Sequence, residues 1–512
     1  MHCGILLAVG GLMLWAVFLK TGQISYPYPL DDSYIHLSIS RTLADQGLWS
    51  PTPDRFEFSS SSPLFTLLLS GLFLISGPSL WWPMILNIAA SLVLVWLLWS
   101  ALPASSNTVK SLWLWVIIIT TPIILPMLMG MEHALQLPIF LAWLIAWLQK
   151  QENPRSSFSL KLVLLTIAMV TIRYEGLFLL GAAGLWWLFQ KRWKEAILLG
   201  CAGFLPVIAL GLFSLSQGGT FLPLSLLMKG YSPQANLGSI AIWISSILTK
   251  LYEHPFIFPV LSISAAGMWM GGSLSSKLRS ASFVLQVAGW VHVLFAEIGG
   301  YRYEAYLFLL HAWLLASILD ELSIKITWRI FLASAWLLLP ILIRTAYFSG
   351  NYPLAVQNIY HQSVQVGRFI ERYYPTEHIA MHDIGVATWL SNFPLTDLAS
   401  IGDEEVYELY HHQAFTADKV QELLERRGVR LAIIQQGWMG YVIPSDWRCA
   451  GSWTIQDHFI IALPEVFFWA KDQKTYDELL KNLRLFRDEL PEGIVEQGPY
   501  VGTPLPEVKT PQ

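Results

Sequence analysis

Two adjacent carboxylates, Asp31 and Asp32, stand near the N-terminus at the start of a segment that is predicted to be helical. Ile35 belongs to an apolar face that repeats every four residues, while His36 and Ser40 share a second, polar face. One aspartate is enough to cap a helix, because its oxygens accept hydrogen bonds from the free N–H groups of the first turn. A second adjacent carboxylate is repelled by the first and needs another partner. The pattern is therefore compatible with helix capping and with acid–base or cation-binding chemistry.

More ionisable side chains lie in the short polar turns that separate apolar segments. Polar turns are ordinary, and arginine and lysine reach membrane interfaces through their long stems. Charged groups at the ends of apolar segments are nevertheless costly unless they are paired or functional, and both signs occur here. These residues are Glu132, Arg173, Glu175, Lys229 and Arg302, which is followed by Tyr303.

Such a set of groups suits one kind of chemistry in particular. A carboxylate can take a proton from a sugar hydroxyl, while lysine and arginine hold a phosphate leaving group. Alternatively, Asp31, Asp32 and Glu132 could share a divalent cation such as Mg²⁺ or Mn²⁺, which would shield the phosphate. The sequence contains no Walker A motif, no His-Glu-x-x-His motif and no glycine-rich nucleotide site. A sugar donor would therefore be linked to a lipid and would approach from the bilayer.

The composition indicates where these residues must lie. The chain has 512 residues, of which 54% are hydrophobic and only 13% are charged, and its mean hydropathy is +0.48. An ordinary globular protein carries about 25% charged residues. The chain is therefore predicted to be a polytopic α-helical membrane protein, and not a secreted, fibrous, disordered or nucleic-acid-binding one. The formal net charge is −4, and acidic residues outnumber basic ones only in the part after residue 346.

Apolar runs recur as far as residue 346, and about 20 helical residues are needed to cross about 30 Å of hydrocarbon. The run at 63–77 is too short and is predicted to be a partly embedded or surface helix. Leaving it out of the spans gathers most lysines and arginines of the short loops on one side, which the positive-inside rule makes cytoplasmic. The eleven predicted spans are 4–20, 80–101, 111–129, 133–149, 161–175, 176–190, 195–216, 255–274, 280–299, 304–321 and 327–346.

This topology places the N-terminus in the cytoplasm and the C-terminal region outside, as expected for a protein of the bacterial inner (plasma) membrane. Residues 1–346 form the predicted membrane domain, with outer loops at 21–79 and 217–254 that fold on the membrane surface. Residues 347–512 form a predicted extracytoplasmic α/β domain. Its expected elements are a helix at 355–374, a strand at 378–382, a helix at 417–427 and a strand at 429–435.

Residues 30–49, which begin Leu-Asp-Asp-Ser-Tyr-Ile-His, resemble the first outer loop of the GT-C superfamily. These are integral-membrane glycosyltransferases that use polyprenyl-phosphate sugars, and the pattern is most similar to arabinofuranosyltransferase-like and mannosyltransferase-like members. Tyr174 stands where many relatives have proline, and Leu224 stands where the usual residue is asparagine. The other similar motifs, in order, are Ser62-Pro63, Gly130-Met131-Glu132, Arg173-Tyr174-Glu175, the loop from Leu222 to Lys229, Arg302-Tyr303 and His382-Asp383-Ile384-Gly385.

The resemblance implies a GT-C fold whose site lies between the outer loops and the membrane. Asp31 would be the catalytic carboxylate, deprotonating the acceptor directly or through a cation, and Asp32 and Glu132 would support it. Direct displacement would invert the anomeric centre. Metal dependence varies across the superfamily, so it stays open. The implied substrate-binding residues are His36, Glu132, Arg173, Glu175, Lys229, Arg302 and Tyr303, of which Arg173, Lys229 and Arg302 would bind the donor phosphate.

The leading hypothesis is a transferase that moves a sugar from a polyprenyl-phosphate carrier to an extracytoplasmic acceptor glycan, lipid or protein. A transporter or flippase of lipid-linked sugar is the alternative that Glu297 and His292, in the ninth predicted span, would favour. Most charges lie at the ends of spans, however, whereas transporters place them near the bilayer midplane in repeated halves. A third alternative is a non-catalytic subunit of an envelope assembly complex. In the tail, we interpret Asp383, His411 and His412 as isolated surface-loop residues.

Overall fold

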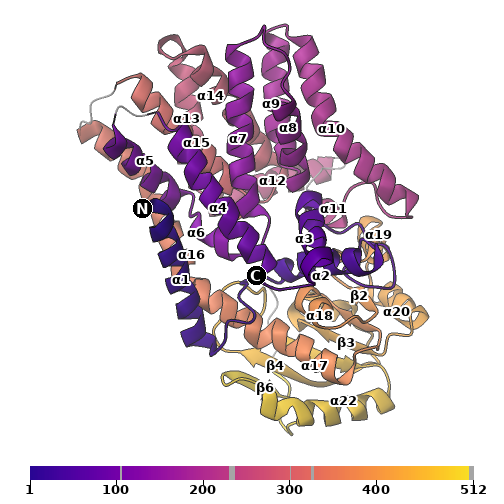
Figure 1. Cartoon of the computed structure of the whole chain (residues 1–512). Helices are drawn as coiled ribbons and strands as arrows, with labels where there is room; N and C mark the ends of the chain where they lie inside the picture. Colours follow the sequence, from indigo (N-terminus) through magenta and orange to yellow (C-terminus); the bar gives the residue numbers. More distant parts are fainter. Residues whose placement is uncertain (104–105, 230–236, 300, 324–327, 507–512) are drawn as a thin grey trace.

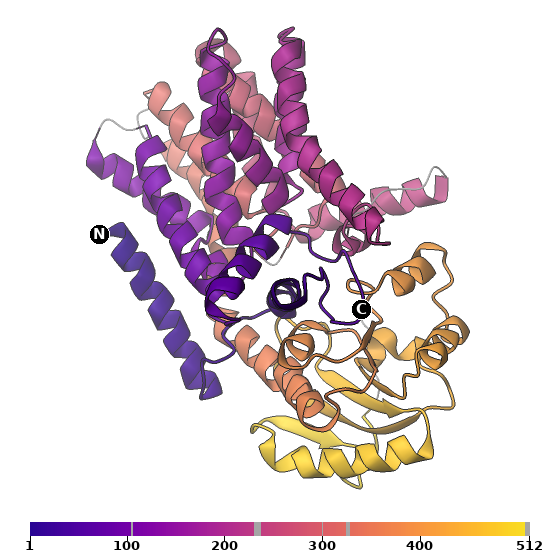
Figure 2. The same ribbon diagram turned by 45° about the vertical axis from the view of Figure 1, so that its right-hand side comes forward.

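The computed structural model describes residues 1–103, 106–229, 237–299, 301–323 and 328–506. A bundle of helices occupies one end of the molecule and a mixed α/β domain occupies the other (Figures 1 and 2). Part of the first outer loop lies between them. The predicted fold class, a helical domain followed by a C-terminal α/β domain, is therefore confirmed.

Long apolar helices make up most of the bundle, and each predicted span coincides with one or two of them. They are α1 (His2–Thr21), α4 (Trp82–Ala101), α5 (Asn107–Thr120), α6 (Ile124–Leu128), α7 (His133–Glu152), α8 (Leu160–Ile172), α9 (Gly176–Phe189), α10 (Trp193–Ser216), α13 (Ile257–Trp269), α14 (Ser276–Phe295), α15 (Ala305–Glu321) and α16 (Trp328–Ile359). Among the described helices, α1, α4, α10 and α14 are long and apolar enough to cross a membrane by length and composition. The number of spans stays a prediction.

The third predicted span is not a continuous helix. α5 ends at Thr120 and the short α6 begins at Ile124, with Pro122 between them. Proline has no N–H to donate and its ring clashes with the preceding turn, which favours a break at this position. After α6 the chain turns at Gly130, and Met131 and Glu132 follow directly before α7.

The outer loops are folded into helices of their own. The first loop contains α2 (Asp31–Gln46) and α3 (Pro63–Ser76), and the second contains α11 (Leu224–Lys229) and α12 (Leu237–Glu253). α3 is as short as predicted, since its 14 residues reach only about 21 Å. α2 differs from the simple amphipathic expectation, because every residue from Ser33 to Ser40 is buried. α3 packs on α2 from the membrane domain and α18 (Gly385–Leu390) packs on it from the α/β domain.

The α/β domain is built on a mixed sheet with the strand order β2-β1-β3-β5-β4-β6 in the described residues. β1 lies parallel to β2 and β3, and the remaining neighbours are antiparallel. The predicted elements at 378–382, 417–427 and 429–435 correspond to β1, α20 and β3. The strands are β1 (Ile379–Met381), β2 (Leu395–Asp397), β3 (Leu431–Ile434), β4 (Arg448–Ile455), β5 (Glu465–Ala470) and β6 (Ile494–Gln497), and the longer helices are α17 (Gln365–Tyr373), α19 (Glu404–His411), α20 (Ala417–Arg426) and α22 (Gln473–Phe486).

Two of the connections between the domains are made by helices α16 and α2. α16 runs without interruption past residue 346 and leads through a π-helical turn into α17, so the helix predicted at 355–374 is a continuation of the last bundle helix. The second connection is α2 against α18. Arg41 donates to the carbonyl oxygens of Thr388 (2.8 Å) and Trp389 (2.7 Å) at the end of α18, where a cation complements the helix dipole.

Candidate active site

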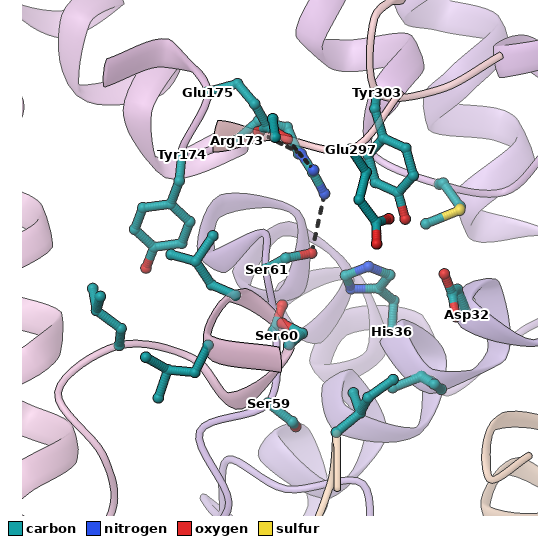
Figure 3. Close-up of a pocket in the computed structure, with 18 of the residues that line it drawn as sticks. Asp32, His36, Ser59, Ser60, Ser61, Arg173, Tyr174, Glu175, Glu297 and Tyr303 are labelled. Carbon is teal, nitrogen blue, oxygen red and sulfur yellow. Dashed lines mark hydrogen bonds and ion pairs between the residues drawn. The ribbon is translucent and has the colours of Figure 1, made fainter. Parts of the chain in front are cut away.

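A cavity of about 580 Å³ lies where the bundle, the outer loops and the α/β domain meet. Its walls come from α2, the turn before α3, the turn between α8 and α9, α11, the end of α14 and α19. Figure 3 shows the side chains of α2, of the turn before α3 and of the α8–α9 turn that face it. The residues predicted from the sequence that line it are Asp32, His36, Arg173, Glu175 and Tyr303. These five are far apart in the chain, and only the fold brings them together.

Asp32 is the member of the aspartate pair that faces this cavity. Its Oδ2 accepts a hydrogen bond of 2.6 Å from Nη1 of Arg302. The Arg302 guanidinium in turn lies over the ring of Tyr303, 4.7 Å from its centre. A cation held between a carboxylate and an aromatic face is well placed to receive a second anion, such as a phosphate.

A second ionic cluster forms the back of the cavity and is almost completely buried. Arg173 is only 7% exposed and Glu132 is fully buried. Nη1 of Arg173 donates to Glu132 (2.8 Å) and to Ser61 (3.1 Å), and Nε donates to Glu175 (2.9 Å). The other Glu132 oxygen lies 3.2 Å from Nε2 of His36. The cluster therefore joins α2, the turn before α3, the start of α7 and the α8–α9 turn through charge-assisted bonds.

Gly130 explains why the turn before Glu132 has the sequence Gly-Met-Glu. Its φ is +71°, a conformation that side-chain-bearing residues seldom adopt. A Cβ at this position would also overlap the ring of Tyr28. Tyr28 is fully buried and is held by hydrogen bonds to the carbonyl of Leu80 and from the N–H of Met84, so the ring cannot move aside.

We expect Gly130→Ala to lower the free energy of unfolding by roughly 2–4 kcal/mol, because backbone strain and overlap with a fixed ring add together. Gly22→Ala is the matched control, since Gly22 has a similar φ of +68° but open space around its Cβ position. That variant should lose only about 1 kcal/mol. Thermal unfolding in detergent measures both, and equal losses would show that the contact with Tyr28 does not matter.

Asp31 faces the α/β domain and is not among the residues that line the cavity. Its two carboxylate oxygens accept hydrogen bonds from the backbone N–H groups of Gly385 (2.6 Å) and Val386 (2.9 Å) at the start of α18. Gly385 is required there, because a Cβ would collide with the backbone of Asp31. Asp31 thus holds the α/β domain against α2 at one end of α18, as Arg41 does at the other.

Asp383 was interpreted from the sequence as an isolated surface residue, and the structure corrects this. Its carboxylate is close enough to Asp31 and Asp32 for their charges to interact at the joint between the domains. Burial, together with the charge of Asp383, raises the pKa of Asp31 to about 7. Burial and the charge of Asp32 likewise raise the pKa of Asp383 to about 7. Asp383 follows the end of strand β1. The sequence predicts that strand but not which part of the membrane domain its end contacts.

These raised pKa values predict that the joint weakens as the pH increases. A carboxyl whose pKa rises from 3.8 to about 7 on folding destabilises the folded protein progressively as the pH rises from about 4 to about 7, and above that pH the loss is complete. Wild-type protein should therefore have a lower Tm at pH 8 than at pH 6. Asp383→Asn should raise the Tm at pH 8 by roughly 2–5 °C, raise it by less at pH 5.5 and change it little at about pH 4.

The control for this measurement is Asp446→Asn, which removes an exposed carboxylate of the same domain. It should leave the pH dependence of the Tm as in the wild type. A Tm of the Asp383→Asn protein that follows the wild-type curve from pH 5.5 to pH 8 would contradict the assignment.

Several residues of the cavity were not predicted from the sequence. Ser59, Ser60 and Ser61 line it from the turn before α3. Glu297, which was connected only with the transport alternative, lines it from the segment after α14. The run of serines directly before Pro63, at the start of α3, is the sequence feature from which these serines could have been predicted. His411 is exposed, as expected for a surface residue, but it is the last residue of α19 and lies on the cavity wall, so it is not isolated in a loop.

Lys229 is the last residue of α11, and its side chain lies outside the described part of the structure. Glu297 and His292 were the residues that would favour transport. His292 is buried, with its ring nitrogens 3.1 Å from the Tyr306 hydroxyl and 3.1 Å from the Glu297 carbonyl oxygen. Glu297 lies beyond the end of α14 in the same cavity as Asp32. Glu297 therefore lines the cavity, and His292 is held next to it by hydrogen-bonding distances to Tyr306 and to the Glu297 backbone.

A shared cation on Asp31, Asp32 and Glu132 does not fit the observed contacts. Both Asp31 oxygens are occupied by backbone N–H groups, and Glu132 is engaged by Arg173 and His36. Within the described ranges, no group of three or more His, Cys, Asp or Glu side chains is placed to hold a metal ion. As placed, Asp31, Asp32 and Glu132 therefore do not form a shared Mg²⁺ or Mn²⁺ site.

Comparisons with known proteins define the class of this fold. Residues 357–476 match a family described as a domain of unknown function (DUF8728). No curated protein matches the chain. The structure is similar over 93% of its length to ArnT from Cupriavidus metallidurans bound to undecaprenyl phosphate, of which it covers 99%, with 11% identity and a TM-score of 0.53.

Two further solved structures are similar over most of the chain. ArnT from C. metallidurans in the apo state is covered to 98%, over 92% of this chain, with 11% identity and a TM-score of 0.48. An Archaeoglobus fulgidus oligosaccharyltransferase in complex with Zn and sulfate is covered to 76%, over 97% of this chain, with 12% identity and a TM-score of 0.42. The likeness to ArnT over nearly the whole of both chains confirms that this protein has the GT-C fold that its motifs resemble.

Proposed function

We propose that this protein is a membrane glycosyltransferase that moves a sugar from a polyprenyl-phosphate-linked donor to an acceptor on the outer face of the membrane. The observation that carries the proposal is the cavity that Asp32, Arg173 and Glu175 line beside an apolar wall, with Arg302 bound to Asp32. The acceptor would be a glycan, a lipid or a protein. The fold shared with ArnT, which was solved with undecaprenyl phosphate, supports a donor of this lipid class.

The proposed reaction is a direct displacement at the anomeric carbon. The acceptor hydroxyl oxygen forms the new bond to that carbon, while the bond from the carbon to the phosphate oxygen breaks. The hydroxyl proton passes to a carboxylate, and polyprenyl phosphate leaves with the electron pair. Attack opposite the leaving group inverts the anomeric centre.

We assign the proton-accepting role to Asp32, although the resemblance to GT-C enzymes had implied Asp31. Asp32 faces the cavity, whereas both oxygens of Asp31 are bound to α18. Arg302 is assigned to the donor phosphate, because its guanidinium already holds one anion at the cavity wall. Binding of the phosphate by Arg302 weakens the hold of the guanidinium on the Asp32 carboxylate, which accepts the proton.

One wall of the cavity is apolar and could contact the lipid part of the donor. This wall is made by Leu177 and Phe178 of α9, by Leu222 before α11, and by Leu226 and Leu227 of α11. Placing the polyprenyl chain there puts its phosphate toward Arg173 and Arg302, which is the orientation that the reaction requires. Lys229 at the end of α11 remains a third candidate for the phosphate. In this arrangement the α/β domain is extracytoplasmic and the N-terminus is cytoplasmic.

The proposal is tested by reconstituting the full chain in proteoliposomes with a panel of radiolabelled polyprenyl-phosphate sugars and envelope extract as acceptor. A transferase releases polyprenyl phosphate and places the label in a new product. A flippase would change the side on which the labelled lipid is found but would release no polyprenyl phosphate. Release of none from any donor, under conditions in which the protein remains folded, would overturn the proposal.

A further inference from the structure

Two aromatic rings on α19 project from the α/β domain into the cavity. Tyr407 and His411 are four residues apart and therefore lie on the same face of the helix. Their ring centres are 5.6 Å apart and their planes differ by 22°. Both side chains line the cavity that also contains Asp32, and both keep part of their surface free, Tyr407 less and His411 more. They thus form an accessible, nearly parallel aromatic pair next to the proposed reaction centre.

The position of this pair is determined by a buried ionic network that joins the two parts of the protein. Asp403 caps α19 by accepting from the N–H of Val406 (3.2 Å). Its carboxylate also accepts from Arg55 of the first outer loop (2.8 Å) and from Arg427 (2.5 and 3.1 Å). Glu57 of the same loop accepts from the N–H of Glu404 (3.0 Å). Since Asp403 and Glu57 are buried, α19 is held firmly from both sides.

The surroundings of the pair indicate what it would bind. The lipid-facing wall of the cavity belongs to α9 and α11, whereas α19 belongs to the α/β domain and reaches the cavity beside α11 (Figure 1). A ligand that rests on α19 therefore enters from the aqueous side. A sugar ring has apolar C–H faces and a polar edge, so an aromatic pair can cover a face while Glu297 and Ser59 remain available to its hydroxyls.

We propose that Tyr407 and His411 form a stacking subsite for a sugar ring of the acceptor. The inference rests on the proposed transferase function and adds that the acceptor is a glycan or glycolipid that presents a sugar at its reacting end. The subsite orients the acceptor hydroxyl toward Asp32. The aromatic pair belongs to acceptor binding, so its loss should raise the KM for the acceptor and leave the KM for the lipid-linked donor unchanged.

The first test measures sugar binding without any transfer reaction. Saturation-transfer NMR on the full chain in detergent would use the methyl glycosides of glucose, galactose, mannose and arabinose as probes. We expect at least one probe to bind the wild type, with its signal reduced about fivefold or more in Tyr407→Leu and His411→Leu. His411→Phe should retain binding because it keeps an aromatic ring. Tyr441→Leu is the matched control, since Tyr441 is an exposed aromatic residue of the same domain that does not line the cavity.

The outcomes separate this inference from the proposed function. No binding of any probe to the wild type, or equal signals from wild type and Tyr407→Leu, would overturn the subsite. Asp32→Asn should bind the probe normally, because Asp32 is assigned to proton transfer. If binding depends on Tyr407 while no donor releases polyprenyl phosphate, the sugar subsite stands and the transferase proposal fails. With a productive acceptor, a Tyr407→Leu change confined to the donor KM would overturn the assignment to the acceptor.

Discussion

Asp32→Asn is expected to lower the rate of sugar transfer by about 10²–10⁴-fold while the protein stays folded. Asparagine has nearly the same shape as aspartate and its amide oxygen can still accept from Arg302, so the cavity wall should be preserved. It cannot take up the acceptor proton, however. The loss should therefore appear in kcat, with similar KM values for donor and acceptor. Release of labelled polyprenyl phosphate by the purified variant in proteoliposomes measures the effect.

Two variants on the same helix serve as comparisons. Asp45→Asn removes an exposed carboxylate near the end of α2 and should transfer sugar at the wild-type rate. Asp31→Asn weakens the bond to α18 and should mainly lower the Tm, with a smaller loss of transfer than Asp32→Asn. Abolished transfer in Asp31→Asn together with normal transfer in Asp32→Asn would return the proton-accepting role to Asp31.

Arg173→Met is expected to reduce the free energy of unfolding by about 3–5 kcal/mol, because it leaves two carboxylates buried without their cation. Glu132 is completely buried, and Glu175 is bound to the same guanidinium. The Tm in detergent should fall by roughly 5–10 °C. Transfer should also be lost, since Arg173 lines the cavity beside Ser61.

The controls for Arg173→Met distinguish two causes of instability, the burial of an uncompensated charge and the loss of an ion pair. Arg372→Met breaks an ion pair with Glu489 whose side chains are 55% and 42% exposed, and it should cost less than about 1 kcal/mol. The double variant Arg173→Met/Glu132→Gln should be more stable than Arg173→Met alone, because it removes one of the uncompensated charges. A double variant no more stable than the single one would show that uncompensated Glu132 is not the source of the loss.

The site belongs to both domains, which affects how the α/β domain should be understood. Asp31 and Arg41 of α2 bind the two ends of α18, and Arg55 and Glu57 bind the start of α19. α19 then supplies part of the cavity wall. The domain therefore completes the cavity and does not simply extend from the membrane. We expect separation of the two parts to destroy the acceptor side of the site.

Much of the site could be predicted because membranes penalise charge. Glu132, Arg173, Glu175 and Arg302 were recognisable from the sequence as polar groups at the ends of apolar runs, where an unpaired charge is costly. The structure pairs all of them. The short α3 and the change from apolar helices to an α/β tail were also predictable, because hydropathy and periodicity are local properties of the sequence.

The choice between Asp31 and Asp32 could not be made from the sequence. Adjacent residues on a helix point about 100° apart, so which one faces a cavity depends on what packs around the helix. The sequence by itself determined that this is a helical membrane protein with an acidic α/β tail and charged span ends. Only the tertiary structure decided that Asp31 binds the start of α18 and that Asp32 binds Arg302. It also decided that Ser59, Glu297 and His411 line the same cavity as Asp32. Contacts between residues hundreds of positions apart depend on how whole elements pack, and no local pattern encodes that packing.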